Sequence, residues 1–302
     1  MIKDILENIL AKENIKENEP MKNHISFKTG GCARYFVTPE CSDEVIAVID
    51  ALKKEKVPYT VIGNGSNLLF SDKGFDGAVV CIGKKMSSVS ADGVSVTAQA
   101  GALLSRISSV ATANSLTGFE FASGIPGSLG GALVMNAGAY GGEMKDVVRT
   151  TTYVDASGKI KTISSEEHQF GYRKSVFKNG DVILSSVIEL KKGYREEIKS
   201  KCEELNARRR EKQPLEYPSA GSTFKRPEGH FASKLIDDAS LRGYRVGGAM
   251  VSEKHCGFVI NYDNATSMDI FNLMKEVKRT VYDKFGVVLE PEVRLIGDFP
   301  EF

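Results

Sequence analysis

The sequence of 302 residues predicts an α+β protein of two or three domains. Three observations support this class. Residues 34–82 read as strand, helix, strand, loop and strand, a unit in which a ligand lies at the carboxyl end of a strand. Residues 94–190 consist mostly of strand-like runs, and no proline interrupts residues 127–213, which suits intact sheet ladders. The two prolines of QPLEYP then precede a further set of helices and strands, compact enough to form a separate domain.

The chain is expected to begin with a helix over residues 2–14, where apolar residues recur at helical spacing. Ser42 is expected to cap a second helix, which runs to Lys56 and is ended by Pro58. The apolar face of that helix comprises Val45, Ile46, Ile49 and Leu52. The strands expected in this part are 34–38, 59–63, 68–70 and 78–82.

The middle of the chain is expected to contain one helix of small residues, over 102–114, among strands. These strands are 94–100, 147–155, 159–163 and 182–190, with turn signals DASG and KNGD between the last three. A charged helix over 194–212 follows, with a narrow apolar stripe. The last elements are helices at 231–239 and 267–285 and strands at 257–261 and 287–297.

Charge and composition exclude several function classes. Forty Lys and Arg residues balance thirty-nine Asp and Glu residues, and the resulting net charge of +1 argues against a dedicated nucleic-acid binder. No window approaches 18 consecutive apolar residues, and the charged amino terminus lacks the apolar core of a secretory signal. Five scattered cysteines and four histidines show no spacing typical of a disulfide framework or a metal site. We therefore expect a cytoplasmic protein with no membrane or nucleic-acid partner.

Glycine is over-represented and clustered. The chain has 29 glycines where typical usage predicts roughly 21, and eight lie between Gly118 and Gly142. The segment GNGSN, residues 63–67, directly follows an expected strand, and its N–H groups can form a nest for an anion; a plain tight turn is an equal alternative. The run at 119–143 suits backbone pressed against a diphosphate or a flat ring, or else a loop of small residues. Two such segments together favour a large nucleotide cofactor.

Three polar residues stand in segments suited to binding an anion or moving a proton. Arg173, in YRKSVFK, has apolar neighbours and offers a fork for a carboxylate or phosphate, although a surface salt bridge is the commoner role. Ser222 lies among small residues, where a serine usually bonds its own turn. Period-two alternation places Glu292 with Glu290 and Arg294 on one strand face, which is more often simply solvated.

Seven segments, taken in order, resemble the UDP-N-acetylenolpyruvoylglucosamine reductase family over roughly residues 20–297. They are NHISFKTGG, IGNGSNLL, GIPGSLGGALVMNAGAYGGE, YRKSVFK, AGSTFKRP, LRGYRVGGAMVSEKHCGFVIN and LEPEVRLIG. The resemblance implies an FAD-binding unit of the p-cresol methylhydroxylase/vanillyl-alcohol oxidase type, made of two α+β subdomains, and a C-terminal α+β substrate-binding domain. The expected boundaries are 1–82, joined by the strand at about 287–302, then 83–195, and 196–286.

The resemblance also implies a reaction. NADPH reduces FAD, and the flavin then reduces the enolpyruvyl double bond of UDP-N-acetylglucosamine enolpyruvate to give UDP-N-acetylmuramate in peptidoglycan precursor synthesis. Arg173 matches the residue that stabilises charge on the substrate carboxylate. Ser222 matches the proton donor to the adjacent carbon. Glu292 matches the third catalytic residue, and a carboxyl group beside a substrate carboxylate is expected to be protonated and to act as a neutral hydrogen-bond donor.

The cofactor and substrate residues follow from the same match. The residues expected to hold FAD are Gly63, Asn64, Gly65, Ser66, Asn67, Ser123, Gly124, Gly127, Ser128, Gly130, Gly131, Asn136, Ala137 and Gly138. Because no histidine lies in these loops, we expect FAD to be bound non-covalently. The residues expected to bind the sugar nucleotide, by a less exact match, are Tyr172, Arg209, Lys212, Lys225, Arg242 and Tyr244.

One branch of the family has an extra tyrosine-bearing loop after the YRxSxFK motif. Lys178 is followed almost at once by the strand DVILSSV, so this chain resembles the shorter branch. Two other interpretations stay open: an FAD-dependent small-alcohol oxidase of the same fold, and a sensor that binds a nucleotide sugar without catalysis. Nucleic-acid binding through the basic run 208–212 is disfavoured by the net charge. We expect a monomer or a weak oligomer.

Overall fold

The structure is a computed structural model that describes residues 2–178 and 180–302. The chain forms two compact units, each assembled from several stretches of sequence. Unit 1 comprises residues 1–17, 35–64 and 77–209, and unit 2 comprises residues 18–34, 65–76 and 210–302. Residue 179, in the expected KNGD turn, lies outside the described residues.

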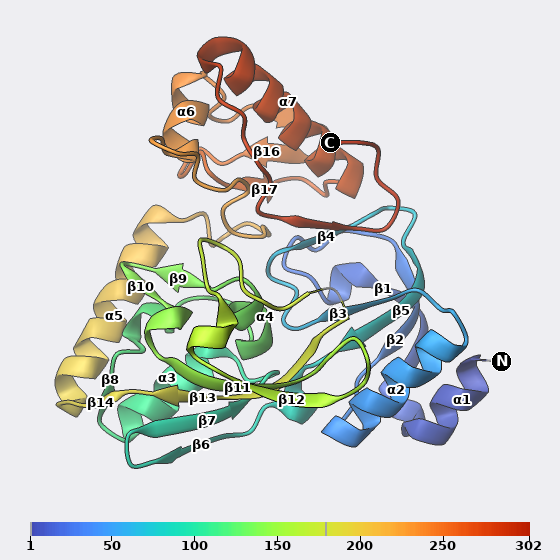
Figure 1. Cartoon of the computed structure of the whole chain (residues 1–302). Helices are drawn as coiled ribbons and strands as arrows, with labels where there is room; N and C mark the ends of the chain where they lie inside the picture. The colour runs from blue at the N-terminus through green and yellow to red at the C-terminus, as the bar shows by residue number, and fades with distance from the viewer. Residues whose placement is uncertain (1, 179) are drawn as a thin grey trace. The chain divides into compact units, whose positions relative to one another are not determined.

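The strand, helix and strand expected in residues 34–82 are confirmed. The first sheet has the strand order β1 (Ile15–Pro20), β2 (Cys32–Val37), β5 (Phe75–Cys81) and β3 (Tyr59–Ile62), with β3 parallel to β5. Helices α1 (Ile2–Ile9) and α2 (Ser42–Lys54) lie side by side along it (Figure 1). The expected first helix is therefore five residues too long, because a 3₁₀ turn at Lys12–Asn14 replaces its end.

Helix α2 begins one position earlier than its predicted cap implies. Ser42 is the first helical residue, and Cys41 holds the cap position in an extended conformation without a side-chain hydrogen bond. The helix ends at Lys54 rather than Lys56, because Lys56 adopts a left-handed φ of 54°. Three of the four residues of its predicted apolar face are buried in the core, and Ile46 is half-buried.

The second sheet of unit 1 has five antiparallel strands. Their order is β12 (Ile160–Ser164), β11 (Val148–Val154), β13 (Val182–Glu189), β7 (Ser95–Gln99) and β6 (Val89–Asp92). Helix α3 (Leu104–Ala113) packs on this sheet, and two short pairs, β8 (Leu116–Thr117) with β14 (Lys191–Lys192) and β9 (Gly138–Ala139) with β10 (Gly142–Glu143), lie outside it. The proline-free stretch thus forms paired strands, as predicted, but the β11–β13 ladder is interrupted by register shifts between Val148 and Thr150 and between Thr152 and Tyr153.

The glycine-rich run contains a helix that periodicity did not predict. Helix α4 (Leu129–Val134) contains two glycines, which disfavour helix, yet Leu129, Ala132 and Leu133 are buried. Tertiary packing therefore overrides local propensity here. The charged helix expected at 194–212 is confirmed as α5 (Arg195–Lys212), with Ile198 and Leu205 buried.

Unit 2 is built around a small antiparallel sheet, β15 (Arg245–Val246), β16 (Ala249–Val251) and β17 (Val259–Asn261). Helix α7 (Ser267–Phe285) packs across all three strands and contacts α6 (Ala232–Asp238) (Figure 1). A separate parallel pair joins β4 (Leu68–Phe70) to β18 (Arg294–Ile296).

The C-terminal strand expected at 287–297 is reduced to β18. Pro291 has no N–H for a ladder, and the residues around it pair instead with the Phe224 segment. The predicted alternation still holds, because Leu289 and Val293 are buried whereas Glu290 is exposed. The predicted domain boundaries at 82, 195 and 286 stay predictions.

Helix α7 is capped by a residue distant in sequence. Asp72 accepts hydrogen bonds from the N–H groups of Ser267 (2.8 Å) and Met268 (2.9 Å), two of the amides that a helix start leaves unpaired. Thr266 and Asp269 complete a reciprocal capping box.

Replacing Asp72 with alanine is expected to lower the free energy of unfolding by about 1 kcal/mol, because two helix N–H groups lose an anionic acceptor. Urea unfolding followed by circular dichroism measures this change. Asp76→Ala is the matched control. The Asp76 side chain is 89% exposed, and an exposed ion pair such as the one it forms with Arg34, at 3.4 Å, adds little stability. Equal effects of the two substitutions would contradict the capping role.

Candidate active site

Two predicted cofactor segments, about 60 residues apart in sequence, meet in unit 1. The Asn64 Nδ2 donates to the carbonyl of Pro126 at 2.7 Å. A Cβ built on Gly63 would lie 2.0 Å from the Ser128 Oγ, a distance that no side chain tolerates. A larger residue at position 63 therefore forces the Ser128 hydroxyl to move, at the point where the end of β3 approaches the 123–131 loop.

That loop carries two buried hydroxyl groups with unused hydrogen-bonding capacity. Within residues 2–178 and 180–302, the Ser123 Oγ and the Ser128 Oγ are buried without a hydrogen-bond partner. Buried polar atoms are normally paired, so each points to a group that the chain does not itself supply. The Gly127 carbonyl and the Gly130 N–H are by contrast bonded to Leu104 and Ala100. The two serine hydroxyls suit an anionic oxygen such as that of a diphosphate.

Arg209 lies beside the same loop. A Cβ built on Gly124 would lie 2.4 Å from the Asn206 Oδ1 and 3.2 Å from the Arg209 Cδ, so Gly124 packs directly on α5. Burial lowers the pKa of the half-buried Arg209 guanidinium, and no carboxylate of the described residues bonds to it. A partly desolvated cation without an anion is suited to a negatively charged ligand.

Asn136 is held by the protein itself. Its buried Nδ2 donates to the Glu143 Oε2 (2.9 Å) and to the Gly171 carbonyl (3.1 Å), while its Oδ1 accepts from the Lys145 N–H (3.0 Å). A hydrogen bond from Lys145 lowers the pKa of Glu143 and keeps it anionic. The predicted cofactor segment 136–138 is thereby tied to the turn that precedes Arg173.

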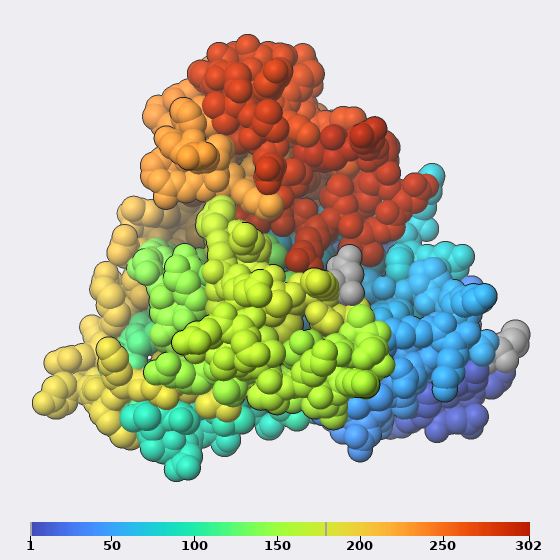
Figure 2. All heavy atoms as spheres, viewed as in Figure 1, coloured from blue at the N-terminus to red at the C-terminus, as the bar shows by residue number. Residues whose placement is uncertain are grey.

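Arg173 sits in a strained turn. Gly171 and Lys174 exchange two backbone hydrogen bonds, at 3.0 and 3.3 Å, and leave Tyr172 and Arg173 at the tip of a hairpin. Arg173 has a left-handed φ of 54°, and its guanidinium lies 5.3 Å from the centre of the Tyr172 ring. The segment between β12 and β13 that carries this turn lies at the surface, in yellow-green in Figure 2. Such strain is typical of functional positions.

Unit 2 brings together Ser222, Glu292 and the end of the GNGSN segment. The Glu292 N–H donates to the Thr223 carbonyl at 2.8 Å, so Glu292 lies opposite the residue next to the exposed Ser222. The Asn67 Nδ2 donates to the Glu292 carbonyl at 3.0 Å. Gly65 has a φ of 63°, and a Cβ there would lie 2.1 Å from the His24 carbonyl. The structure places Ser66 in the turn between them.

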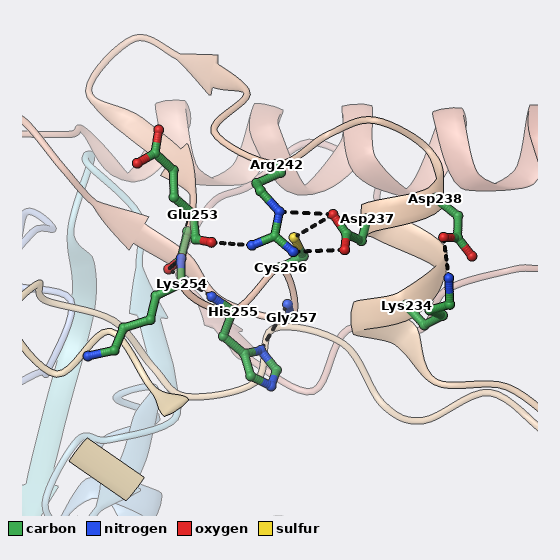
Figure 3. Close-up of polar contacts among 10 residues, drawn as sticks. Lys234, Asp237, Asp238, Arg242, Glu253, Lys254, His255, Cys256 and Gly257 are labelled. Carbon is green, nitrogen blue, oxygen red and sulfur yellow. Dashed lines mark hydrogen bonds and ion pairs between the residues drawn. The ribbon is translucent and has the colours of Figure 1, made fainter. Parts of the chain in front are cut away.

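The other cations differ in how far their charge is already paired. Lys225 forms an ion pair with Glu290 at 3.0 Å. Figure 3 shows Arg242 bound by the carboxylate of Asp237 at 3.0 and 2.7 Å and by the Glu253 carbonyl. The charge of Arg242 is thus already paired by Asp237. Lys212 and Tyr244 are exposed.

Sequence reasoning missed two residues that hold the Arg173 turn. Glu143 binds Asn136, and the Ser175 Oγ donates to the Val134 carbonyl at 2.9 Å. The signals were available, since Glu143 ends the glycine run and Ser175 lies in YRKSVFK. Among the described residues, no group of three His, Cys, Asp or Glu side chains is arranged to hold a metal ion, and no helix is long and apolar enough to cross a membrane.

Comparison with known proteins identifies the family. A family model described as UDP-N-acetylenolpyruvoylglucosamine reductase, C-terminal domain, matches residues 213–296, and one described as an FAD binding domain matches residues 33–164. UDP-N-acetylenolpyruvoylglucosamine reductase of Caldanaerobacter subterraneus subsp. tengcongensis is 52% identical over 296 residues, or 98% of each chain. This chain belongs to the UDP-N-acetylenolpyruvoylglucosamine reductase family.

Other relatives agree. The UDP-N-acetylenolpyruvoylglucosamine reductase of Clostridioides difficile is 51% identical over 96% of each chain. The crystal structure of the Thermus caldophilus enzyme matches with a TM-score of 0.82 at 32% identity, covering 94% of this chain and all of that one. The grass pollen allergen Phl p 4, which has glucose dehydrogenase activity, matches 97% of this chain and 58% of its own with a TM-score of 0.52 at 14% identity, which shows the fold alone. The predicted resemblance and the α+β FAD-binding fold are confirmed.

Gly63→Ala is expected to weaken FAD binding at least tenfold, because its Cβ would displace the Ser128 hydroxyl, one of the two suited to a diphosphate oxygen. Titration of the apoprotein with FAD, followed by flavin fluorescence, measures the dissociation constant. The control is Gly83→Ala, where the added Cβ would meet the Cys81 Sγ at an ordinary 3.4 Å. Unchanged FAD affinity in a folded Gly63→Ala protein would show that the loop contact is dispensable.

Proposed function

We propose that this chain is an NADPH-dependent flavoenzyme that reduces the enolpyruvyl group of UDP-N-acetylglucosamine enolpyruvate to UDP-N-acetylmuramate in peptidoglycan precursor synthesis. The observation that carries the proposal is identity above 50% to reductases of this name over nearly the whole chain. The matched FAD binding domain supplies the cofactor class.

The residues of unit 1 suit FAD. We assign the diphosphate to the buried hydroxyls of Ser123 and Ser128 and to the backbone around Gly63 and Asn64, and a flavin or ribityl contact to residues 136–138. When bound, FAD accepts a hydride from NADPH and delivers it to the enolpyruvyl double bond. These loops contain no histidine, so we infer non-covalent binding.

Arg173 is assigned to the substrate carboxylate. Hydride addition to the terminal carbon leaves negative charge on the adjacent carbon and its carboxylate, and a fixed guanidinium stabilises that charge. Its strained backbone restricts the directions in which the guanidinium can point. The Tyr172 ring beneath it further limits the side chain.

Ser222 and Glu292 are assigned to the proton that completes the reduction. The Ser222 Oγ–H delivers its proton to the carbon next to the carboxylate, and solvent then restores the hydroxyl. The backbone of Glu292 pairs with that of Thr223, the residue after Ser222. As a neutral acid, Glu292 donates a hydrogen bond to the developing enolate. The reduction thus adds one hydride and one proton across the double bond.

The uridine diphosphate part of the substrate needs cations. We assign it to Lys212, Lys225, Tyr172 and Tyr244, with Lys225 exchanging Glu290 for the ligand. Arg209 faces the cofactor loop, which makes FAD an alternative partner for it, and Arg242 is already neutralised by Asp237. A monomeric or weakly oligomeric state and a cytoplasmic location stay predictions.

A double-mixing stopped-flow assay tests the function. Mixing with NADPH is expected to bleach the flavin absorbance, and a second mixing with UDP-N-acetylglucosamine enolpyruvate is expected to restore it much faster than air does. Fast reoxidation by air would support the small-alcohol oxidase, and protein without bound flavin would support the sensor.

The same assay separates the catalytic residues. Arg173→Lys and Ser222→Ala are each expected to slow flavin reoxidation by substrate about 10²- to 10³-fold, with flavin reduction by NADPH little changed. Glu292→Gln keeps a hydrogen-bond donor and is expected to retain much of the activity. Its inactivity with FAD bound normally would instead make Glu292 a proton carrier.

A further inference from the structure

The segment that presents Arg173, residues 168–177, is here called the Arg173 hairpin. Two of its non-glycine residues have left-handed backbones, Gln169 at φ 48° and Arg173 at φ 54°. Such positions are disfavoured and persist only where the surrounding structure fixes them. The hairpin tip is fixed by Asn136, which bonds the Gly171 carbonyl, and by Ser175, which bonds Val134. Its base must be fixed by something else.

His168 lies at that base, and its side chain is fully buried. The ring Nδ1 lies 2.6 Å from the Ser164 carbonyl, and the Nε2 lies 2.7 Å from the Thr151 Oγ1. A carbonyl oxygen can only accept, so Nδ1 carries the proton, and the Nε2 of the neutral ring accepts from the Thr151 hydroxyl at 2.7 Å. The same hydroxyl oxygen also lies 3.2 Å from the Ser186 Oγ on β13. Burial lowers the pKa of His168 and favours this neutral form.

The same residue contacts both arms of the hairpin. Its ring stacks on Phe170 at a centroid distance of 4.7 Å and an angle of 15°, and meets the Phe177 ring edge-on at 5.8 Å. The His168 carbonyl accepts the N–H of Val176 at 2.8 Å. His168 thus links strand β11, through Thr151, to the residues on either side of the strained tip.

We propose that His168 is a positioning residue for Arg173: it fixes the hairpin base on β11, so that the guanidinium is held in one place for the substrate carboxylate. Nothing in the reaction requires His168 to touch the substrate, and its role is exerted through the hairpin backbone. The proposal rests on the proposed function of Arg173, and its test separates the two.

Two adjacent threonines on β11 provide a matched pair of variants. Thr151→Val removes the hydroxyl that contacts His168 and the Ser186 Oγ on β13, and it keeps the shape of the side chain. Thr152→Val, the control, removes a hydroxyl whose hydrogen-bond partner among the described residues is Thr162 on β12, at 2.9 Å. His168→Phe is the second test variant, since it keeps the stacked ring and removes both ring hydrogen bonds.

Hydrogen exchange measures the hairpin without reference to activity. The amides of Lys174 and Val176, which bond within the hairpin, are expected to exchange about tenfold faster in Thr151→Val and His168→Phe, and at the unchanged rate in Thr152→Val. If Thr151→Val leaves both amides unchanged, the proposal is overturned, even where His168→Phe fails to fold.

Stopped-flow kinetics measure the consequence for Arg173. In Thr151→Val, flavin reoxidation by the enolpyruvyl substrate is expected to slow about tenfold while reduction by NADPH stays within twofold, a split that a general loss of stability does not produce. The positioning role is overturned if Thr151→Val speeds exchange in the hairpin but leaves flavin reoxidation unchanged, while Arg173→Lys slows reoxidation. If Arg173→Lys itself reoxidises normally, the assignment of Arg173 fails, whatever the exchange data show.

Discussion

Close packing against glycine backbone, possible only where a side chain is missing, is the constraint on which the candidate site depends. Gly63 lies against Ser128, and Gly124 lies against α5. Two other glycines of unit 1 are packed as closely: Gly101 lies against the Gly83 carbonyl, and Gly142 lies against the Phe121 ring. The glycine excess therefore serves contacts of the protein with itself as well as the space for a cofactor. Because these contacts hold the 123–131 loop in place, its two buried serine hydroxyls keep a fixed direction.

The pairing of charge divides the cations into two groups. Lys225 and Arg242 have carboxylate partners, so a ligand phosphate must compete with Glu290 or Asp237. Arg209 is half-buried and has no carboxylate partner among the described residues. A desolvated guanidinium gains more from an incoming anion than an exposed, paired one does. Net charge near zero gives no hint of this difference, because it sums paired and unpaired groups alike.

Periodic elements could be predicted from sequence, and elements that depend on distant contacts could not. Helix α7 and the strands of the second sheet follow their apolar patterns closely. Helix α4 was not predicted because its glycines disfavour helix. The strand predicted around β18 was too long, because the apolar alternation continues through Pro291 whereas the hydrogen-bonded ladder does not. For the site, residue types and order pointed to Arg173, Ser222 and Glu292. Two features of the site depend on residues distant in sequence. Thr223 pairs with Glu292, nearly 70 residues along the chain, and Asn136 makes three hydrogen bonds. The local sequence pattern predicts neither feature.

The capping of α7 by Asp72 and the pairing of β4 with β18 have a consequence for synthesis of the chain. Residues 65–76 leave the ribosome long before their partners, Ser267 and Arg294, exist. At typical elongation rates that interval lasts roughly 10–45 s, during which β4 presents an unpaired edge. Unit 1 ends at Arg209 and can therefore fold before unit 2 is complete. During that interval the early segment of unit 2 lacks its partners, and a chaperone that covers an unpaired strand edge would protect it from aggregation.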